Sequence, residues 1–338
     1  MKISTLISTS ILAFSLLLTG CGSQEVIKTE EENNVKDTLT VFTTIYPLED
    51  FTRKIAGDYV EVKSIYPPNV DAHSYEPSTK DMLQLANSDL FIYTGVGIEG
   101  FAEKASEALV KENVQVLKAA QGIALIESAD EHHHEGEEGH SESESHEDEN
   151  TESEVHEEEN GAHGDLDPHV WLDPILSIDL ANNIKNSLSN LLPEHASEFE
   201  ANFNLLKSEL EKLDQEFKTT IESAKTKELL VAHAAYGYWE ARYGIEEIAI
   251  SGLSPTQEPS QKELQTIIEE STEHNIHYVI FEQNVSPKVA KIIQDEIGAK
   301  SLPLHNLEAI TDENIKQKDD YFSIMRRNLE TLETALNE

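Results

Sequence analysis

The sequence predicts an α/β protein of two similar lobes with mainly parallel sheets, joined by one long rigid helix. Strand-like runs alternate with helix-like runs from Leu39 to Leu117 and again from Glu228 to Pro303. Such alternation indicates a parallel sheet with helices on its faces. Between the two series, apolar residues recur every three or four positions, the spacing of one helix face. They are Phe199, Phe203, Leu206, Leu210, Leu213, Phe217 and Ile221.

The N-terminal lobe is predicted over residues 38–190. Its strand-like runs are rich in β-branched and aromatic residues, and its helix-like runs carry an apolar face. The expected order is strand Thr38–Thr44, helix Leu48–Gly57, strand Tyr59–Tyr66, helix Thr79–Asn87, strand Asp89–Thr94, helix Glu99–Lys111 and strand Val114–Leu117.

The linking helix is predicted over residues 191–226, with Pro193 preceding its apolar stripe, and the C-terminal lobe over residues 227–338. This second lobe repeats the alternation of the first. The expected order is strand Glu228–Ala232, strand Glu246–Ile250, helix Gln261–His274, strand His277–Glu282, helix Lys288–Glu296, strand Ala299–Pro303 and helix Asp319–Leu336.

Residues 1–20 are typical of a signal peptide, because a Lys near the start precedes an apolar stretch too short for a comfortable membrane span. This stretch ends in Leu18-Thr19-Gly20-Cys21, which resembles a bacterial lipobox. Cleavage there would leave Cys21 as a lipid-modified N-terminus. Residues 21–37 are polar and acidic, and indicate a disordered tether. Cys21 is the only cysteine, so a buried metal ion would need His, Asp or Glu ligands.

Residues 128–166 form a segment of low complexity that is rich in histidine and acid. Sixteen acidic residues and no Lys or Arg lie between Asp130 and Asp165. The segment has no apolar period, so we expect a mobile loop whose imidazoles and carboxylates collect a divalent metal ion weakly and raise its local concentration. Its candidate weak ligands are His132, His133, His134, His140, His146, His156 and His163.

The formal net charge of −40 excludes a nucleic-acid-binding protein that works through phosphate contacts. The same charge favours attraction of cations.

Three other histidines lie beside residues that restrict the backbone. His73 follows the second predicted strand, His169 lies between Pro168 and Pro174, and His233 ends the first strand of the C-terminal lobe. Ligands of open α/β sheets bind outside the carboxyl ends of the strands. We therefore expect these three imidazoles to meet in one cleft between the lobes.

The segments around these histidines, DAHSYEPS, DPHVWLDP and AHAAYGY, resemble those of the metal-binding lipoproteins that feed ABC importers, in particular the zinc-binding ZnuA/AdcA branch. The resemblance runs from about Leu39 to the C-terminus and includes the lipobox and the histidine-rich insert. It implies that His73, His169 and His233 bind Zn²⁺. One departure is the absence of the cysteine pair that staples the second lobe in enterobacterial members.

The fourth ligand implied by the resemblance is a carboxylate near the last strand, which corresponds to Glu308. Glu282, His305 and water remain alternatives. Asp71, Glu76, Asp167, Asp173 and Glu282 are candidates to orient the imidazoles. Three imidazoles and one carboxylate suit tetrahedral zinc, whereas manganese prefers more oxygen ligands, and the manganese-binding relatives have a carboxylate in place of His233.

The resulting hypothesis is a lipid-anchored monomer on the extracytoplasmic face of the cell membrane that captures Zn²⁺ for the membrane subunit of an ABC permease. It is not expected to be an enzyme, since the sequence contains neither HExxH nor GxSxG. A zinc-binding surface adhesin is the first alternative, and a zinc hydrolase with three histidine ligands and a water is the second.

Overall fold

The computed structural model describes residues 38–127, 166–283 and 288–338. The expected signal peptide, the tether with Cys21 and the seven histidines of the acidic segment lie outside these residues. Glu127 and Leu166, the described residues on either side of this segment, form an antiparallel bridge.

The first sheet contains four parallel strands in the order β2-β1-β3-β4. Val41 of the central strand β1 pairs with Val62 of β2 on one side and with Leu90 of β3 on the other. All residues of β3 are buried, as expected for a parallel strand covered by helices on both faces. The strands are β1 Leu39–Thr43, β2 Val60–Ser64, β3 Leu90–Tyr93 and β4 Gln115–Lys118.

The second sheet repeats this topology in the order β6-β5-β7-β8, again with parallel pairing. Two similar parallel sheets therefore confirm the predicted fold class. Every strand predicted from the sequence is present. The strands are β5 Glu228–His233, β6 Glu246–Ser251, β7 Tyr278–Glu282 and β8 Lys300–Leu304.

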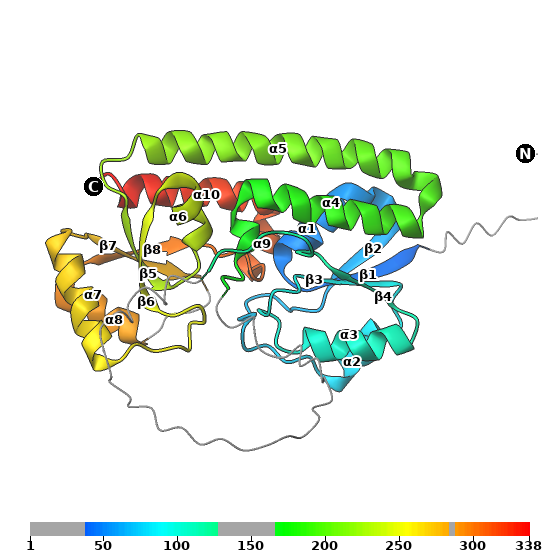
Figure 1. The fold of residues 1–338 in the computed structure, drawn as a ribbon, viewed down its shortest axis with the longest axis horizontal. Coiled ribbons are helices and arrows are strands. Elements are labelled where there is room, and N and C mark those ends of the chain that lie inside the picture. The colour runs from blue at the N-terminus through cyan, green and yellow to red at the C-terminus, as the bar shows by residue number, and fades with distance from the viewer. Residues whose placement is uncertain (1–37, 128–165, 284–287) are drawn as a thin grey trace, which may run out of the picture. The chain divides into compact units, whose positions relative to one another are not determined.

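The helices cover both faces of the sheets, with α2 and α3 on one side of the first sheet and α4 and α5 on the other (Figure 1). They are α1 Tyr46–Ala56, α2 Thr79–Leu85, α3 Ala102–Lys111, α4 Pro174–Leu191, α5 Ala196–Glu222, α6 Gly237–Tyr243, α7 Gln261–Glu273, α8 Lys288–Ile297, α9 Asp312–Gln317 and α10 Tyr321–Ala335. Short 3₁₀ turns occur at Gly57–Tyr59, Val170–Leu172 and Pro193–His195.

The linking helix is confirmed as the 27-residue α5, and all seven residues of its apolar stripe are buried. It packs against α1, α4 and α10. The sequence analysis missed α4, although its start is well marked: the Asp173 carboxylate accepts hydrogen bonds from two backbone N–H groups of the first turn, and Pro174 occupies the first helical position. The shorter helices α6 and α9 were missed as well.

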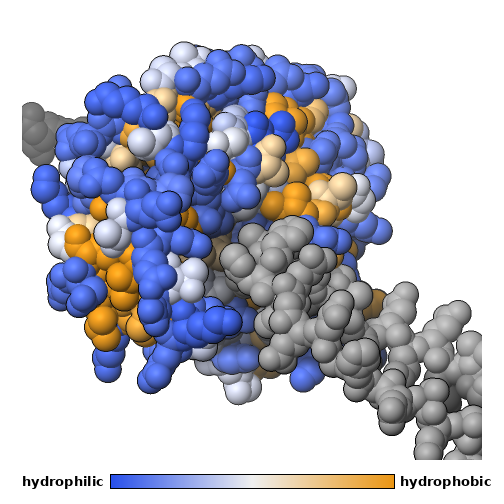
Figure 2. Space-filling view, turned by 60° about the vertical axis from the view of Figure 1, so that its left-hand side comes forward, coloured by the Kyte–Doolittle hydropathy of each residue, from blue (hydrophilic) through white to orange (hydrophobic). Residues whose placement is uncertain are grey.

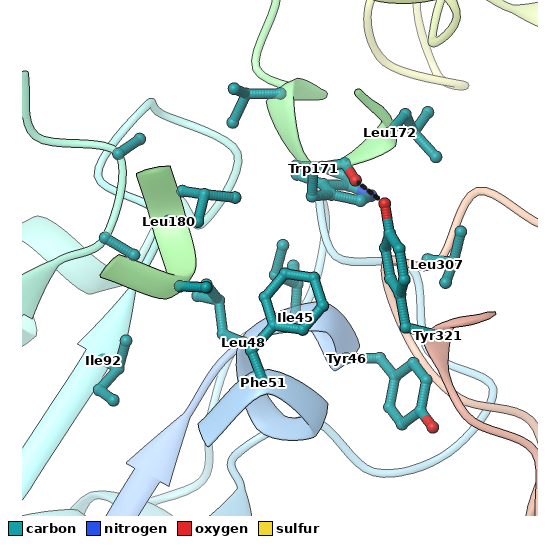
Figure 3. Packing of buried hydrophobic residues seen from close by; sticks show 14 of the residues in the cluster. Ile45, Tyr46, Leu48, Phe51, Ile92, Trp171, Leu172, Leu180, Leu307 and Tyr321 are labelled. Carbon is teal, nitrogen blue, oxygen red and sulfur yellow. Dashed lines mark hydrogen bonds between the residues drawn. The ribbon is translucent and has the colours of Figure 1, made fainter. Parts of the chain in front are cut away.

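The main hydrophobic core contains residues from both sheets and from α1, α4, α5 and α10. Figure 3 shows its centre, where Trp171 and Leu172 from the segment before α4 pack near Phe51 of α1 and Tyr321 of α10. The Tyr321 hydroxyl donates a hydrogen bond of 2.8 Å to the Trp171 carbonyl. The segment that carries His169 is therefore anchored in the centre of the core.

The face drawn in Figure 2 is mostly hydrophilic, with apolar patches between the hydrophilic side chains. Within the described residues, the exposed large apolar side chains include Leu83, Val110, Leu205, Ile292 and Ile315. None of the described helices combines the length and apolar character needed to span a membrane.

Candidate metal centre

Four potential metal ligands from distant parts of the chain meet at one point. His73, His169, His233 and Glu308 each present one ligand atom, and these atoms lie within 4.8 Å of one another. His169, His233 and Glu308 are buried, while the His73 side chain is 11% exposed. We refer to these residues as the four-residue site.

His73 lies in the loop that follows β2. The Asp71 carboxylate accepts hydrogen bonds from the His73 backbone N–H at 3.1 Å and from the Ser74 hydroxyl at 2.5 Å, so it shapes the turn that presents the imidazole. The same loop contacts the C-terminal part of the chain, because Asn69 donates its backbone N–H to the Ile310 carbonyl. The loop of His73 is thus attached to the loop of Glu308.

His169 is oriented by Asp167. One Asp167 oxygen accepts hydrogen bonds from both the His169 backbone N–H and the ring Nδ1–H, each at 2.8 Å. This contact fixes a proton on Nδ1 and directs Nε2 towards the site. Gly237 makes room for the carboxylate, since a Cβ atom there would lie 2.7 Å from Asp167 Oδ2. The glycine after Tyr236 thus has a packing role.

His233 ends the central strand β5, and the sheet register places Glu282 beside it. Val231 of β5 pairs with Ile280 of β7, so the residues two positions further on, His233 and Glu282, are neighbours at the carboxyl ends of both strands. Glu282 Oε1 lies 2.9 Å from His233 Nδ1. This carboxylate therefore faces the ring nitrogen that points away from the four-residue site.

Glu308 is held in a turn after β8. Its Oε1 accepts a hydrogen bond from the Asn306 side chain at 2.9 Å, and its Oε2 accepts one from the Ala72 backbone N–H at 3.3 Å. Leu307, between Asn306 and Glu308, has the positive φ of 62°, which is uncommon for a residue with a side chain. The turn is stabilised by hydrogen bonds from both lobes.

His305 belongs to this turn but does not face the site. Its Nδ1 accepts the Leu307 backbone N–H at 2.9 Å, so Nε2 carries the proton and donates to Asn314 Oδ1 at 3.0 Å. Burial lowers the pKa of His305 to about 4, which keeps the ring neutral. With both ring nitrogens engaged inside the fold, His305 has none left to offer to a metal ion.

The spacing of the ligand atoms suits a four-coordinate ion. Glu308 Oε1 lies 3.3, 3.8 and 4.0 Å from Nε2 of His73, His169 and His233. Ligands of a tetrahedral zinc ion, each bonded at about 2.0–2.1 Å, are separated by about 3.3 Å. The three Nε2 atoms are buried and lack a hydrogen-bond partner among the described residues. Buried polar atoms without partners are costly, and a bound cation would satisfy all three.

The charges of the site are strongly coupled. Burial lowers the pKa of His169, but Asp167 and Glu308 outweigh this effect and raise it to about 10. Burial acts to raise the pKa of Glu308, but the three imidazoles outweigh it and hold the pKa well below its usual range. The metal-free site at neutral pH therefore contains a carboxylate and a protonated His169.

The candidates for orienting the imidazoles divide into three groups. Asp71, Asp167 and Glu282 contact the histidines as described above. Asp173 instead caps α4 and forms an ion pair with Arg242 at 2.5 Å, and Glu76 is exposed.

The sequence analysis missed Asn306, Gly237 and Glu247. Glu247 Oε1 accepts the backbone N–H groups of Ala235 and Tyr236, which fixes the turn after His233. Burial and the charge of Asp167 raise the pKa of Glu247 to about 8. Glu247 and Gly237 act on residues of other elements, so no local sequence pattern marks these contacts, whereas Asn306 contacts Glu308 within the same turn.

Two parallel α/β lobes joined by a long helix, with a buried site of three imidazoles and one carboxylate, define a metal-binding member of the solute-binding proteins. The family described as "Zinc-uptake complex component A periplasmic", ZnuA, matches residues 41–335. The chain belongs to this family.

Two curated relatives illustrate the match. The high-affinity zinc uptake system protein ZnuA of Bacillus subtilis is 33% identical over 326 residues, which cover 96% of each protein. The zinc-binding protein AdcA of Streptococcus pyogenes is 36% identical over 293 residues, which cover 86% of this chain and 55% of AdcA. The chain therefore spans about half the length of the AdcA relatives that it matches.

Two solved structures share the fold. The Zn(II)-bound ZnuA-like domain of Streptococcus pneumoniae AdcA is 31% identical with a TM-score of 0.69, and the match covers 89% of this chain and all of that domain. The laminin-binding protein Lmb of Streptococcus agalactiae, described as bifunctional with adhesin and metal transporting activity, is 29% identical with a TM-score of 0.72. That match covers 88% of this chain and all of Lmb.

Proposed function

We propose that this chain is a lipid-anchored, monomeric solute-binding protein that captures Zn²⁺ outside the cytoplasmic membrane and delivers it to the membrane subunit of an ABC permease. His73, His169, His233 and Glu308 are the proposed ligands. The observation that carries this proposal is the convergence of three unpartnered, buried Nε2 atoms on one carboxylate oxygen. A set of three nitrogens and one oxygen suits zinc better than manganese.

A carrier role is supported by the number of protein ligands. A catalytic zinc ion keeps one position open for water, whereas a site with four protein ligands is closed. Glu282 lies on the Nδ1 side of His233, and both ring nitrogens of His305 are engaged. These contacts favour Glu308 over Glu282 and His305 as the fourth ligand.

The lipid anchor at Cys21 and the zinc-collecting role of the acidic segment remain proposals, since both lie outside the described residues. A relative in Streptococcus pneumoniae is named zinc-binding lipoprotein AdcA, which supports the anchor. The ends of the acidic segment meet beside Asp167, whose backbone N–H donates to the Ile126 carbonyl at 3.0 Å. Weakly bound zinc would thus be concentrated close to the residue that orients His169.

The test is zinc uptake by a strain that lacks this gene. We expect slower growth and lower zinc uptake when zinc is scarce, both restored by the full chain. A chain without residues 130–164 should also restore uptake, but less effectively at the lowest zinc concentrations. Because Lmb is described as an adhesin as well as a metal transporter, attachment to surfaces is measured in parallel. Unchanged zinc uptake with lost attachment would favour the adhesin instead.

Zinc binding at pH 7.5 is expected to release about one proton per ion. The pKa of His169 in the metal-free site is raised to about 10, and zinc must displace a proton from the site because it binds neutral imidazole. Between about pH 7 and 10 the apparent affinity should therefore rise about tenfold per pH unit. Calorimetric titrations in buffers with different ionisation enthalpies measure the released protons. Zinc binding without proton release at pH 7.5 would contradict this assignment.

A further inference from the structure

Asn306 contacts Glu308 through both ends of its side-chain amide. The amide NH₂ donates to Glu308 Oε1 at 2.9 Å, and the amide oxygen accepts the Glu308 backbone N–H at 3.2 Å. The reverse orientation of the amide would place oxygen against carboxylate and NH₂ against N–H, so the observed orientation is the favourable one. Asn306 is buried, and these contacts are protected from competition by water.

The backbone of Asn306 is fixed as firmly as its side chain. The Trp171 indole N–H donates to the Asn306 carbonyl at 2.8 Å, and the next residue, Leu307, is buried with a φ of 62°. The Trp171 contact holds the backbone of Asn306 in place, and the two hydrogen bonds with Glu308 hold its side-chain amide. The amide is therefore a rigid support for the carboxylate.

The hydrogen bonds that hold the Glu308 carboxylate allow only one of its oxygens to face the imidazoles. Oε1 is the oxygen within 4.0 Å of the three Nε2 atoms, while Oε2 is committed to the Ala72 backbone N–H at 3.3 Å. For both oxygens to bind one ion, the carboxylate would have to rotate, and rotation would break the hydrogen bonds to Asn306 and Ala72. Glu308 is thus held as a single-oxygen ligand.

We propose that Asn306 is a specificity-determining residue that keeps Glu308 a single-oxygen ligand and so favours tetrahedral Zn²⁺ over cations that need more oxygen ligands, such as Mn²⁺. This inference rests on the proposed zinc-binding function. Zinc is satisfied by four ligands, whereas manganese prefers six and more oxygen atoms. A Glu308 free to rotate could supply a fifth ligand atom, and Mn²⁺ would gain more from it than Zn²⁺.

A small pocket beside Glu308 and Asn306 strengthens this argument. It has a volume of about 10 Å³, and its lining also includes Val70, Asp71, Glu282, Gln283 and His305. This volume holds one water molecule at most. Shortening Asn306 would enlarge the pocket towards Glu308, giving the carboxylate room to rotate and giving water access to it.

The experiment compares Asn306→Ala and Asn306→Asp with the wild type, using Zn²⁺, Mn²⁺ and Co²⁺ as probes. Competition titrations give the ratio of zinc to manganese affinity. Loss of a residue that orients a metal ligand costs about 10–100-fold in metal affinity, and because the freed carboxylate compensates Mn²⁺ more than Zn²⁺, we expect the ratio to fall about tenfold in both variants. Asn306→Asp keeps the shape of the side chain but loses the N–H donor. The visible absorption of bound Co²⁺, which is intense in four-coordinate sites, should weaken in both variants.

Asn202→Ala is the matched control, because the Asn202 side chain donates to the Ile55 carbonyl away from the site. This variant should keep the wild-type ratio of zinc to manganese affinity and the wild-type absorption spectrum of bound Co²⁺. Equal losses of zinc and manganese affinity in the folded Asn306 variants, with an unchanged ratio and spectrum, would overturn the role of Asn306. A wild-type protein that binds no zinc would overturn the proposed function itself, so the two failures are distinguishable.

Discussion

Replacement of His233 by alanine is expected to lower the affinity for zinc by about 100- to 1,000-fold. Four-ligand zinc sites bind with about 10–16 kcal/mol, so one ligand of four contributes about 3–4 kcal/mol, which corresponds to this factor. His233 is buried at the end of β5, and its Nε2 has no hydrogen-bond partner among the described residues. Competition with a chelator of known zinc affinity measures the change.

His274→Ala is the matched control for His233→Ala. His274 is exposed at the end of α7, where its Nδ1 lies 3.1 Å from Glu228, and its removal should leave zinc affinity unchanged. Circular dichroism should show that both variants are folded. A loss of zinc affinity in folded His233→Ala can then be assigned to the missing ligand and not to unfolding. A folded His233→Ala protein that binds zinc as tightly as the wild type would contradict the proposed ligand set.

Replacement of Trp171 by alanine is expected to lower the free energy of unfolding by about 3–5 kcal/mol, the usual cost of removing a buried aromatic side chain. The indole is fully buried in the centre of the core (Figure 3) and donates to the Asn306 carbonyl. Its ring centroid lies 5.3 Å from that of His169. The same substitution should therefore weaken zinc binding. Unfolding in urea, followed by circular dichroism with and without zinc, measures both effects.

The control for Trp171→Ala is Leu205→Ala on α5. The Leu205 side chain is exposed, at 70%, and an exposed substitution of this kind changes the free energy of unfolding by less than about 0.5 kcal/mol. A Trp171→Ala protein whose free energy of unfolding lies within about 1 kcal/mol of the wild-type value would contradict this prediction. It would show that the core does not depend on the packing of Trp171 or on its hydrogen bond to Asn306.

The regular elements were predictable where their periodicity is strong. All eight strands were found. Central strands such as β3 are buried on both faces and read as continuous apolar runs, whereas β2 alternates between buried and exposed residues. The α5 stripe has helical spacing over its whole length. Helix α4 was missed because Asp173 and Pro174 were assigned to the His169 loop, although a carboxylate followed by proline is also a helix start. Helix α6 has only seven residues, too few to display a period.

The site was predictable to the extent that its motifs are local. His73, His169 and His233 lie at strand ends or between prolines, and those positions are visible in the sequence. Of the residues that contact them, Asp71 and Asp167 lie close by in the sequence, whereas Glu282 was a candidate at the end of another predicted strand. Glu247 and Gly237 act on residues from other elements, and no spacing rule along the chain reveals such contacts. Asn306 lies only two positions from Glu308, but the hydrogen bond between their side chains depends on the conformation of the turn that contains them.

The sequence by itself determined the parallel α/β architecture, the long helix and the three histidines, because periodicity and strand ends are local properties of the chain. Only the tertiary structure decided which acidic group faces the imidazoles. Ala72 and Glu308 are 236 positions apart, yet their hydrogen bond helps to fix the carboxylate. Glu282 is directed to Nδ1 of His233 by the register of β5 and β7, and His305 is occupied by Leu307 and Asn314. Such choices depend on the packing of distant segments, which local sequence patterns do not encode.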